Sequence, residues 1–242
     1  MKNALIVLLF LFLSGKVFSQ ENYEIQVYGS DLIDPGKTIF EVHSNYSLDG
    51  VKKSSGGDFP THHLYRNTIE ITHGFNSWFE TGFYFFNSFG SDNRTGFQGL
   101  HIRPRVRVPK AKNWPVGLSM SAEVGFTHPG FNFTEWNLEL RPIIDKKFSK
   151  LYISLNPVFD RAFNGPGKAA GFQFSPNAAI TYDFTKVITA GVEYYGSLGS
   201  LSGFNDPAFQ QHLIFLAADL NIDPRWELCP GFGWSTNRMA DN

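Results

Sequence analysis

The chain has little cysteine and no long apolar run. Among its 242 residues Cys229 is the only cysteine, which excludes an internal disulfide framework and a zinc ribbon. The longest apolar run, Ala4 to Leu13, is far shorter than the roughly 18 to 20 residues that a membrane helix needs. We therefore expect Cys229 to be inert, and any membrane crossing to be made by strands.

The chain also has almost no net charge, at -1. It holds 21 Lys and Arg against 22 Asp and Glu, which argues against nucleic acid as a partner because such proteins carry a basic excess. The mean hydropathy of -0.19 is low for a helical membrane protein. It suits either a large secreted β domain or a barrel whose strands alternate apolar and polar residues.

The N-terminus has the features of an export signal. Lys2 precedes the apolar core, and Val17-Phe18-Ser19 stands before an expected cleavage near Ser19 and Gln20. We expect residues 1–19 to be a signal peptide. Because residues 38–242 read as a barrel, the expected location is the bacterial outer membrane.

Alternation is clearest between Gly99 and Val108. Leu100, Ile102, Pro104, Val106 and Val108 share one face, while His101, Arg103, Arg105 and Arg107 share the other. Similar segments, each about as long as the ten residues of a tilted membrane strand, recur along the chain. The pattern predicts an all-β protein, an antiparallel up-and-down transmembrane β-barrel.

The strand rhythm gives one domain and its orientation. We expect strands near 39–48, 63–73, 78–88, 99–108, 116–127, 134–144, 151–160, 172–183, 187–197, 211–222 and 226–235. They alternate between short connections, expected in the periplasm, and mostly longer ones. Trp78, Trp114 and Trp226 fall at the short ends and Trp136 and Trp234 at the opposite ends, as in two aromatic girdles. Residues 20–37 would form an N-terminal periplasmic segment and 38–242 the barrel.

Strand parity separates the two faces. The outward positions are Phe40, Val42, Ile69, Ile71, Phe83, Phe85, Leu118, Met120, Val124, Leu138, Leu140, Ile153, Leu155, Phe174, Ile180, Val192, Ile214 and Leu216. The inward ones include Glu41, His43, Ser119, Glu135, Asp183 and Asp219, together with the candidates named below. A charge at the lipid midplane costs a few kcal/mol. A soluble barrel such as a lipocalin would turn its apolar face inward instead. The density of charge on the polar face, the signal peptide and the girdles favour the membrane.

Five prolines occupy outward positions inside these strands: Pro104, Pro142, Pro157, Pro176 and Pro230. Proline removes a ladder donor, so a bulge or kink is expected at each. The functional alternative is that the kinks aim Arg and Asn side chains at a passing solute.

The interior mixes both signs, with five bases against ten acids. The candidates for a lumen constriction are Arg66, Glu70, Glu80, His101, Arg103, Arg105, Arg107, Glu123, Glu139, Arg141, Asn156, Asp160 and Glu193. One interpretation is a self-satisfied ionic core with no open pathway. The other is a constriction in which a basic ladder from Arg103 to Arg107 faces acids such as Glu123 and Glu139 and selects solutes by its field.

Several stretches resemble one family. They are EIQVYGS at 24–30, EITHGF at 70–75, residues 101–109, RPIIDK at 141–146, FSPN at 174–177 and EYYGS at 193–197. They resemble bacterial outer-membrane barrels that are grouped with meta-pathway phenol-degradation and transporter-like proteins. The resemblance covers nearly the whole mature chain and implies about twelve strands and a channel. Outer-membrane lipids, a small solute and the barrel assembly machinery would be its partners.

The C-terminus departs from that family. After the strand at 226–235 the chain stops within seven residues, without the return strand and the terminal aromatic residue usual in such barrels. The strand count would be eleven. Either residues 23–30 supply a closing strand or the twelfth strand is missing, and we expect the latter, with a gap between the first and last strands. Such a gap would expose unpaired backbone to lipid.

Three function classes remain. The favoured one is an outer-membrane channel or transporter-like barrel for small polar or amphiphilic solutes, aromatic ones included, with no enzyme activity, catalytic residue, cofactor or metal. The second is a lipid hydrolase that resembles outer-membrane phospholipase A or lipid A deacylase. It would need a nucleophile beside a base, and no serine motif accompanies the seven histidines. The third is a plugged structural barrel without transport. A metal at Asp58, His62 and His63 is disfavoured because adjacent histidines on an extended loop point apart.

Overall fold

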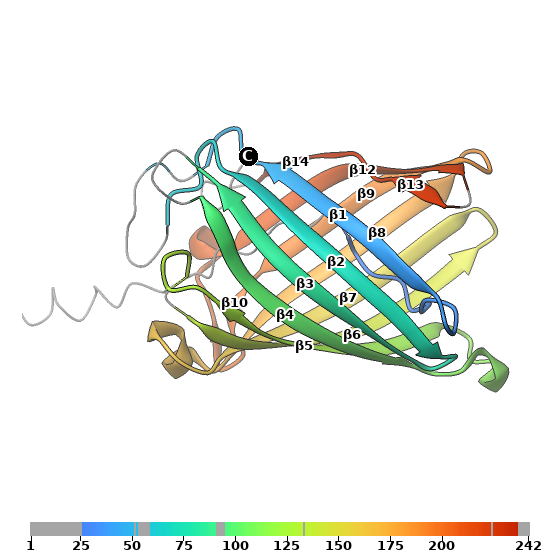
Figure 1. Ribbon diagram of the computed structural model, residues 1–242, viewed down its shortest axis with the longest axis horizontal. Coiled ribbons are helices and arrows are strands. Elements are labelled where there is room, and N and C mark those ends of the chain that lie inside the picture. The colour runs from blue at the N-terminus through green and yellow to red at the C-terminus, as the bar shows by residue number, and fades with distance from the viewer. Residues whose placement is uncertain are drawn as a thin grey trace, which may run out of the picture.

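The computed structural model describes residues 26–50, 52, 59–90, 95–132, 134–223 and 225–236. These residues form one antiparallel sheet, in which each long strand pairs with the next along the chain and the sheet curves into an open barrel (Figure 1). The predicted all-β, up-and-down fold is confirmed. The predicted signal peptide lies outside the described residues. Within them no helix is long and apolar enough to cross a membrane.

The sheet follows the chain from one edge to the other. Its long strands are β1 (Thr38–Tyr46), β2 (Tyr65–Asn76), β3 (Phe79–Phe89), β4 (Gly96–Arg107), β5 (Gly117–Thr127), β6 (Trp136–Phe148), β7 (Leu151–Ala162), β8 (Phe172–Asp183), β9 (Ile188–Ser197) and β12 (Gln211–Asp223). Shorter elements are η1 (Lys110–Lys112), η2 (Pro166–Ala170), β10 (Gly199–Ser200), β11 (Gly203–Phe204), η3 (Pro207–Phe209), β13 (Trp226–Leu228) and β14 (Gly231–Ser235).

The expected strand at 226–235 is split in two. Cys229 and Pro230 separate β13 from β14, yet Leu228 faces Leu220 and Gly231 faces Ala217, so both pieces keep one register with β12. The small hairpin of β10 and β11, which adds to β8, was not predicted. All the other predicted strands are present.

No register shift falls at the five prolines, so the bulges expected there are absent from the described sheet. The register shifts in the described sheet lie at Gly74/Asn76, Phe86/Asn87 and Asn221/Asp223. Pro157 faces Pro176 directly in an unbroken β7–β8 register. Between β6 and β7 the pairing stops at Leu140 with Phe159 and resumes, unshifted, at Ile144 with Leu155. Proline removes a donor, but its fixed φ suits an extended strand, so the ladder loses bonds without gaining a residue.

The connections differ between the two ends of the barrel. Short turns join β2 to β3, β6 to β7 and β8 to β9, while longer loops join β1 to β2, β7 to β8 and β9 to β12. Trp78, Trp114 and Trp226 are exposed at the short-turn end, and Trp136 is exposed at the start of β6 at the opposite end. The connection from β4 to β5 at the short-turn end is longer than those from β3 to β4 and from β5 to β6 at the opposite end, so the predicted separation of short and long connections holds only in part.

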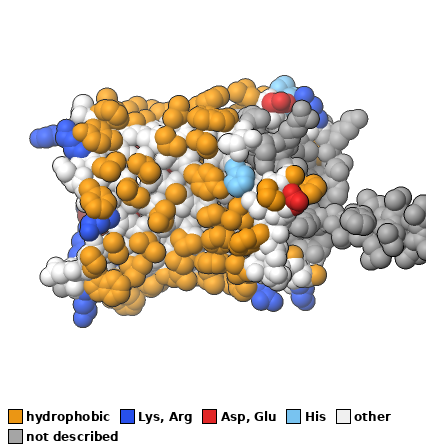
Figure 2. All heavy atoms as spheres, turned by 180° about the vertical axis from the view of Figure 1, so that it is seen from behind, with side chains coloured by type: hydrophobic (Ala, Val, Ile, Leu, Met, Phe, Trp, Pro, Cys, Tyr) orange, Lys and Arg blue, Asp and Glu red, His pale blue; other side chains and the backbone are white. Residues whose placement is uncertain are grey.

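The two faces divide as predicted. None of the eighteen apolar residues assigned outward is buried, and Phe40 and Val42 are 73% and 67% exposed. Figure 2 shows hydrophobic side chains covering the wall of the barrel, with Lys and Arg side chains towards its ends. The residues assigned inward are buried or half-buried, and Glu70 and Asn156 are 0% exposed. The interior of this protein is therefore polar.

The barrel is not closed. In the described chain β1 pairs with β2 alone, and β13 and β14 pair with β12 alone, so a seam separates the first strand from the last. The expected gap is confirmed. Residues 26–30 form no strand, and they lie inside the barrel rather than at the seam. The alternative of a closing strand there is wrong for these residues.

Gly191 tests how closely β8 and β9 pack. A Cβ atom at Gly191 would overlap the backbone of Ile180 and Thr181, whereas one at Gly203 would meet nothing within 4 Å. We expect Gly191→Ala to lower the free energy of unfolding by about 1–3 kcal/mol, because the strands must separate to admit the methyl group.

Denaturant titration of the refolded protein measures this difference, with Gly203→Ala as the matched control. Equal stability of Gly191→Ala and Gly203→Ala would contradict the close approach of the two strands.

Candidate functional site

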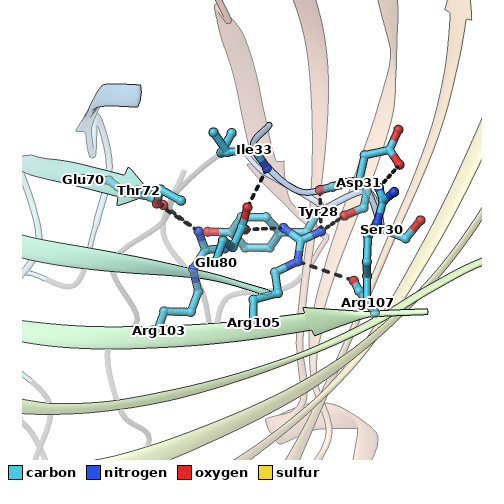
Figure 3. Close-up of polar contacts among 12 residues, drawn as sticks. Tyr28, Ser30, Asp31, Ile33, Glu70, Thr72, Glu80, Arg103, Arg105 and Arg107 are labelled. Carbon is cyan, nitrogen blue, oxygen red and sulfur yellow. Dashed lines mark hydrogen bonds and ion pairs between the residues drawn. The ribbon is translucent and has the colours of Figure 1, made fainter. Parts of the chain in front are cut away.

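Residues 26–33, named here the lumen segment, cross the interior of the barrel. Side chains of β3, β4, β6 and β7 bind its backbone, and Val27 and Tyr28 are almost fully buried. Figure 3 shows this segment running past the inner ends of the β4 arginines. Sequence reasoning had counted these residues within an N-terminal periplasmic segment, and the structure places them against the candidate constriction.

Asn156 on β7 recognises the peptide group at Tyr28. Its side-chain oxygen accepts a 2.8 Å hydrogen bond from the Tyr28 N–H, and its side-chain nitrogen donates a 2.9 Å bond to the Tyr28 carbonyl. The Ser154 hydroxyl donates a second, 2.6 Å bond to that carbonyl. A fully buried amide side chain thus satisfies both backbone groups of one residue.

Asp145 on β6 holds the next part of the segment. Its two carboxylate oxygens accept hydrogen bonds from the Ser30 N–H at 2.7 Å and the Ser30 hydroxyl at 2.8 Å. Tyr152 donates a further bond of 2.6 Å to the same carboxylate. Hydrogen bonds to a charged acceptor are the stronger kind, so this contact anchors the middle of the lumen segment.

The opposite wall binds three further backbone groups of the segment. Arg105 donates to the carbonyl of Gly29 and, at 3.0 Å, to that of Asp31. The Ile33 N–H donates a 2.7 Å bond to Glu80, and Glu80 also pairs with Arg105 at 3.5 Å. Side chains of β3 and β4 therefore bind the lumen segment on one side, and side chains of β6 and β7 bind it on the other.

The Tyr28 ring lies among guanidinium groups. The Cζ atoms of Arg103, Arg141 and Arg105 are 4.5, 4.8 and 5.6 Å from its centroid, within the range of cation–π attraction. The Tyr28 hydroxyl lies 3.0 Å from that of Tyr84. The ring thus fills the space between β4 and β6 and is the centre of the site.

The arginine ladder has other partners than those predicted. Arg103 pairs with Glu70 at 2.6 Å, Arg105 with Glu80, and Arg107 with Asp31 of the lumen segment at 2.8 Å. Glu123 instead lies 2.5 Å from His101, and Glu139 forms a two-bond pair with Arg141. The expected facing of the ladder by Glu123 and Glu139 is therefore corrected.

The other candidates lie on the same inner face. Arg66 is buried on β2, and Asp160 stands opposite Glu139 in the β6–β7 pairing. Glu193 on β9 accepts a hydrogen bond from Tyr195 and lies beside the Val27 backbone. The structure thus gathers the thirteen candidates on the polar inner face of the sheet. Those that contact the lumen segment are Glu80, Arg103, Arg105, Arg107, Arg141, Asn156 and Glu193.

Two groups near the seam have the residue types of metal ligands. They are Glu41, His43 and Glu70, and Asp219, Glu227 and Cys229, with ligand atoms within 4.8 Å of one another in each group. Glu70 is already neutralised by Arg103, so the first group offers less charge to a cation than its residue types indicate. Asp58 of the disfavoured metal site lies outside the described residues, and Cys229 is a free, exposed thiol.

Sequence reasoning missed the lumen segment and two of the residues that bind it, Ser154 and Asp145, together with Tyr152, which donates to Asp145. The available signal was a run of eight residues before β1 with an aromatic ring, two small residues and an acid, at Tyr28 to Asp31. Taken alone, that run has the pattern of an edge strand. Its partners are side chains from strands that are distant in the sequence, and the local pattern does not identify them.

A scan against protein-family models, a search of curated proteins and a search of solved structures found no match to this chain.

The buried pair of Glu70 and Arg103 allows a stability test. Removal of one partner from a buried ion pair leaves a charge without compensation, at a cost of about 3–5 kcal/mol. We expect Glu70→Ala to lower the free energy of unfolding by about that amount. The double variant Glu70→Met with Arg103→Met should regain part of it, because no charge is left alone.

Denaturant titration again measures the effect. The matched control is Asp34→Ala, which breaks an exposed pair in which Lys37 donates a 2.6 Å bond and lowers the pKa of Asp34. The control should leave stability unchanged, since exposed pairs contribute little. A Glu70→Ala protein as stable as the control would show that Arg103 finds another partner.

Proposed function

We propose that this protein is an outer-membrane barrel that works as a channel for small polar or amphiphilic solutes, with the lumen segment lying across its pathway. The observation that carries the proposal is the inverted division of side chains, apolar outward and ionisable inward. A soluble barrel would bury the apolar set instead.

The outer surface supports a membrane location. Apolar side chains such as Phe83, Leu155, Ile180 and Leu216 are 39% exposed or more around the wall, and tryptophans stand at its two ends. A continuous apolar band between aromatic girdles matches the lipid-facing surface of membrane barrels. The family resemblance described for the sequence points in the same direction.

The inner surface supports passage of a polar solute. Arg103, Arg105 and Arg141 are held on strands rather than on loops, in an interior that carries more acids than bases. Rings of charged side chains of this kind select solutes in other pores. Because residues 26–33 occupy the space between these side chains, passage requires their displacement.

A plugged structural barrel is the second candidate. It is favoured by the many direct bonds between the wall and the backbone of the lumen segment, at Tyr28, Gly29, Ser30, Asp31 and Ile33. In that case the segment would be a permanent part of the interior. Conductance separates the two candidates.

The proposed membrane location can be tested by placing a charge at two different depths on the outer wall. Leu155 lies near the middle of β7, and Tyr182 lies at the short-turn end of β8. We expect Leu155→Arg to lower the free energy of unfolding in lipid vesicles by about 2–4 kcal/mol, and Tyr182→Arg by at most about 1 kcal/mol. The reason is that a charge costs most at the bilayer midplane.

Denaturant titration in vesicles supplies both values. In a soluble protein two exposed positions would respond alike, so equal effects of the two substitutions would argue against the membrane.

Ion selectivity tests the pathway. Replacement of Arg103, Arg105 and Arg107 by Gln removes three positive charges from an interior already rich in acids. The reversal potential in planar bilayers under a salt gradient should therefore shift towards cation selectivity.

The matched control replaces three exposed lysines outside the lumen, Lys112, Lys150 and Lys168, by Gln. It changes the net charge equally and should leave the reversal potential unchanged. An identical reversal potential in both triple variants would remove the ladder from the pathway, and absence of current from wild-type and variant proteins would favour the structural barrel.

A further inference from the structure

We propose that the inner wall carries a binding site for an extended peptide, which the lumen segment occupies as a removable plug. The ligand class is a short peptide with an aromatic side chain and, three residues later, a carboxylate. This inference rests on the proposed channel function only in that displacement of the plug is measured as ion current.

The first observation is that the wall recognises peptide backbone. Asn156 binds both the N–H and the carbonyl of Tyr28, Arg105 binds two further carbonyls, and the Ile33 N–H binds Glu80. These contacts come from three separate strands, β3, β4 and β7. Any extended chain presents the same backbone groups, so the contacts do not depend on the side chains of this particular segment.

The second observation is a pair of side-chain subsites. The Tyr28 ring lies within 4.5 to 5.6 Å of three guanidinium groups, with its hydroxyl beside that of Tyr84. The Asp31 carboxylate, three residues on, accepts bonds of 2.8 Å from Arg107 and 2.9 Å from Lys110. This spacing defines the aromatic and acidic positions of the ligand (Figure 3).

The third observation is how the segment is attached. Residues 26–33 make no strand pairing, and they join β1 through a turn in which the Gly36 N–H donates to the Gly74 carbonyl. Gly36 has a φ of 75°, which a glycine adopts without strain. The bonds described above join the segment to side chains of the wall and not to the strand ladder, so the segment can leave while the sheet pairing stays intact.

The experiment uses the full chain with Tyr28→Ala, which removes the ring from the guanidinium groups. The matched control is Tyr182→Ala, on the outer face of β8. We expect the open fraction in planar bilayers to rise about tenfold or more in Tyr28→Ala only, since three cation–π contacts are lost together.

The probe is the acetylated and amidated peptide Gln-Val-Tyr-Gly-Ser-Asp-Leu-Ile, the sequence of residues 26–33. It should reduce the current of Tyr28→Ala in a concentration-dependent manner. Its fluorescently labelled form should bind Tyr28→Ala at least tenfold more tightly than wild type, because the wild-type site is filled. The same peptide with Ala in place of Tyr, and a scrambled peptide, should bind at least tenfold more weakly.

A reversible lock supplies the second measurement. Ser30→Cys and Asp145→Cys, in a Cys229→Ser background, place two thiols where side chains already touch. A short methanethiosulfonate cross-linker should hold the current at its closed level, and a reductant should release it. The single variant Ser30→Cys in the same background is the control.

The outcomes separate the two proposals. Labelled peptide that binds without current in any variant would support the peptide site and overturn the channel. Current that appears in Tyr28→Ala without binding or block by the peptide would overturn the peptide site and leave the channel standing. Equal currents in locked and released protein would show that the lumen segment is not the plug.

Discussion

Compensation of buried charge is the constraint that organises this protein. A sheet that turns its apolar residues outward must enclose the ionisable ones, and each enclosed guanidinium group then requires an anion or a hydrogen-bond acceptor. Arg103 pairs with a carboxylate on β2 and Arg105 with one on β3, whereas the carboxylate that pairs with Arg107 belongs to Asp31 of the lumen segment. The lumen segment is therefore part of the electrostatic balance of the wall, in addition to filling the space inside it.

The same constraint explains what could be predicted. Alternation alone assigns residues such as Glu70 and Leu155 to opposite faces. Successive side chains of a strand point to opposite sides, and each long strand here has one polar and one apolar side. The seam was predictable too, from an odd number of strands. The sequence did not predict the split at Cys229 and Pro230 or the small β10–β11 hairpin. Both depend on which hydrogen bonds the neighbouring strand can make.

Side-chain partners across the lumen could not be predicted in the same way. The ladder was expected to face Glu123 and Glu139, which lie on adjacent strands, yet His101 and Arg141 take those acids through closer contacts. Alternation tells which side a residue faces, and it carries no information on which of ten enclosed acids lies nearest. Alternation also does not predict that an inward side chain binds an irregular segment and not another strand, as Asn156 binds the Tyr28 backbone.

The seam between β1 and β14 also bears on the order of assembly. The lumen segment precedes β1 directly, but its ligands are spread over β3, β4, β6 and β7, which are synthesised later. It can settle only after those strands have curved around it. Because the two edges of the sheet are not paired with each other in the described chain, the segment can be enclosed without being threaded through either end of the barrel.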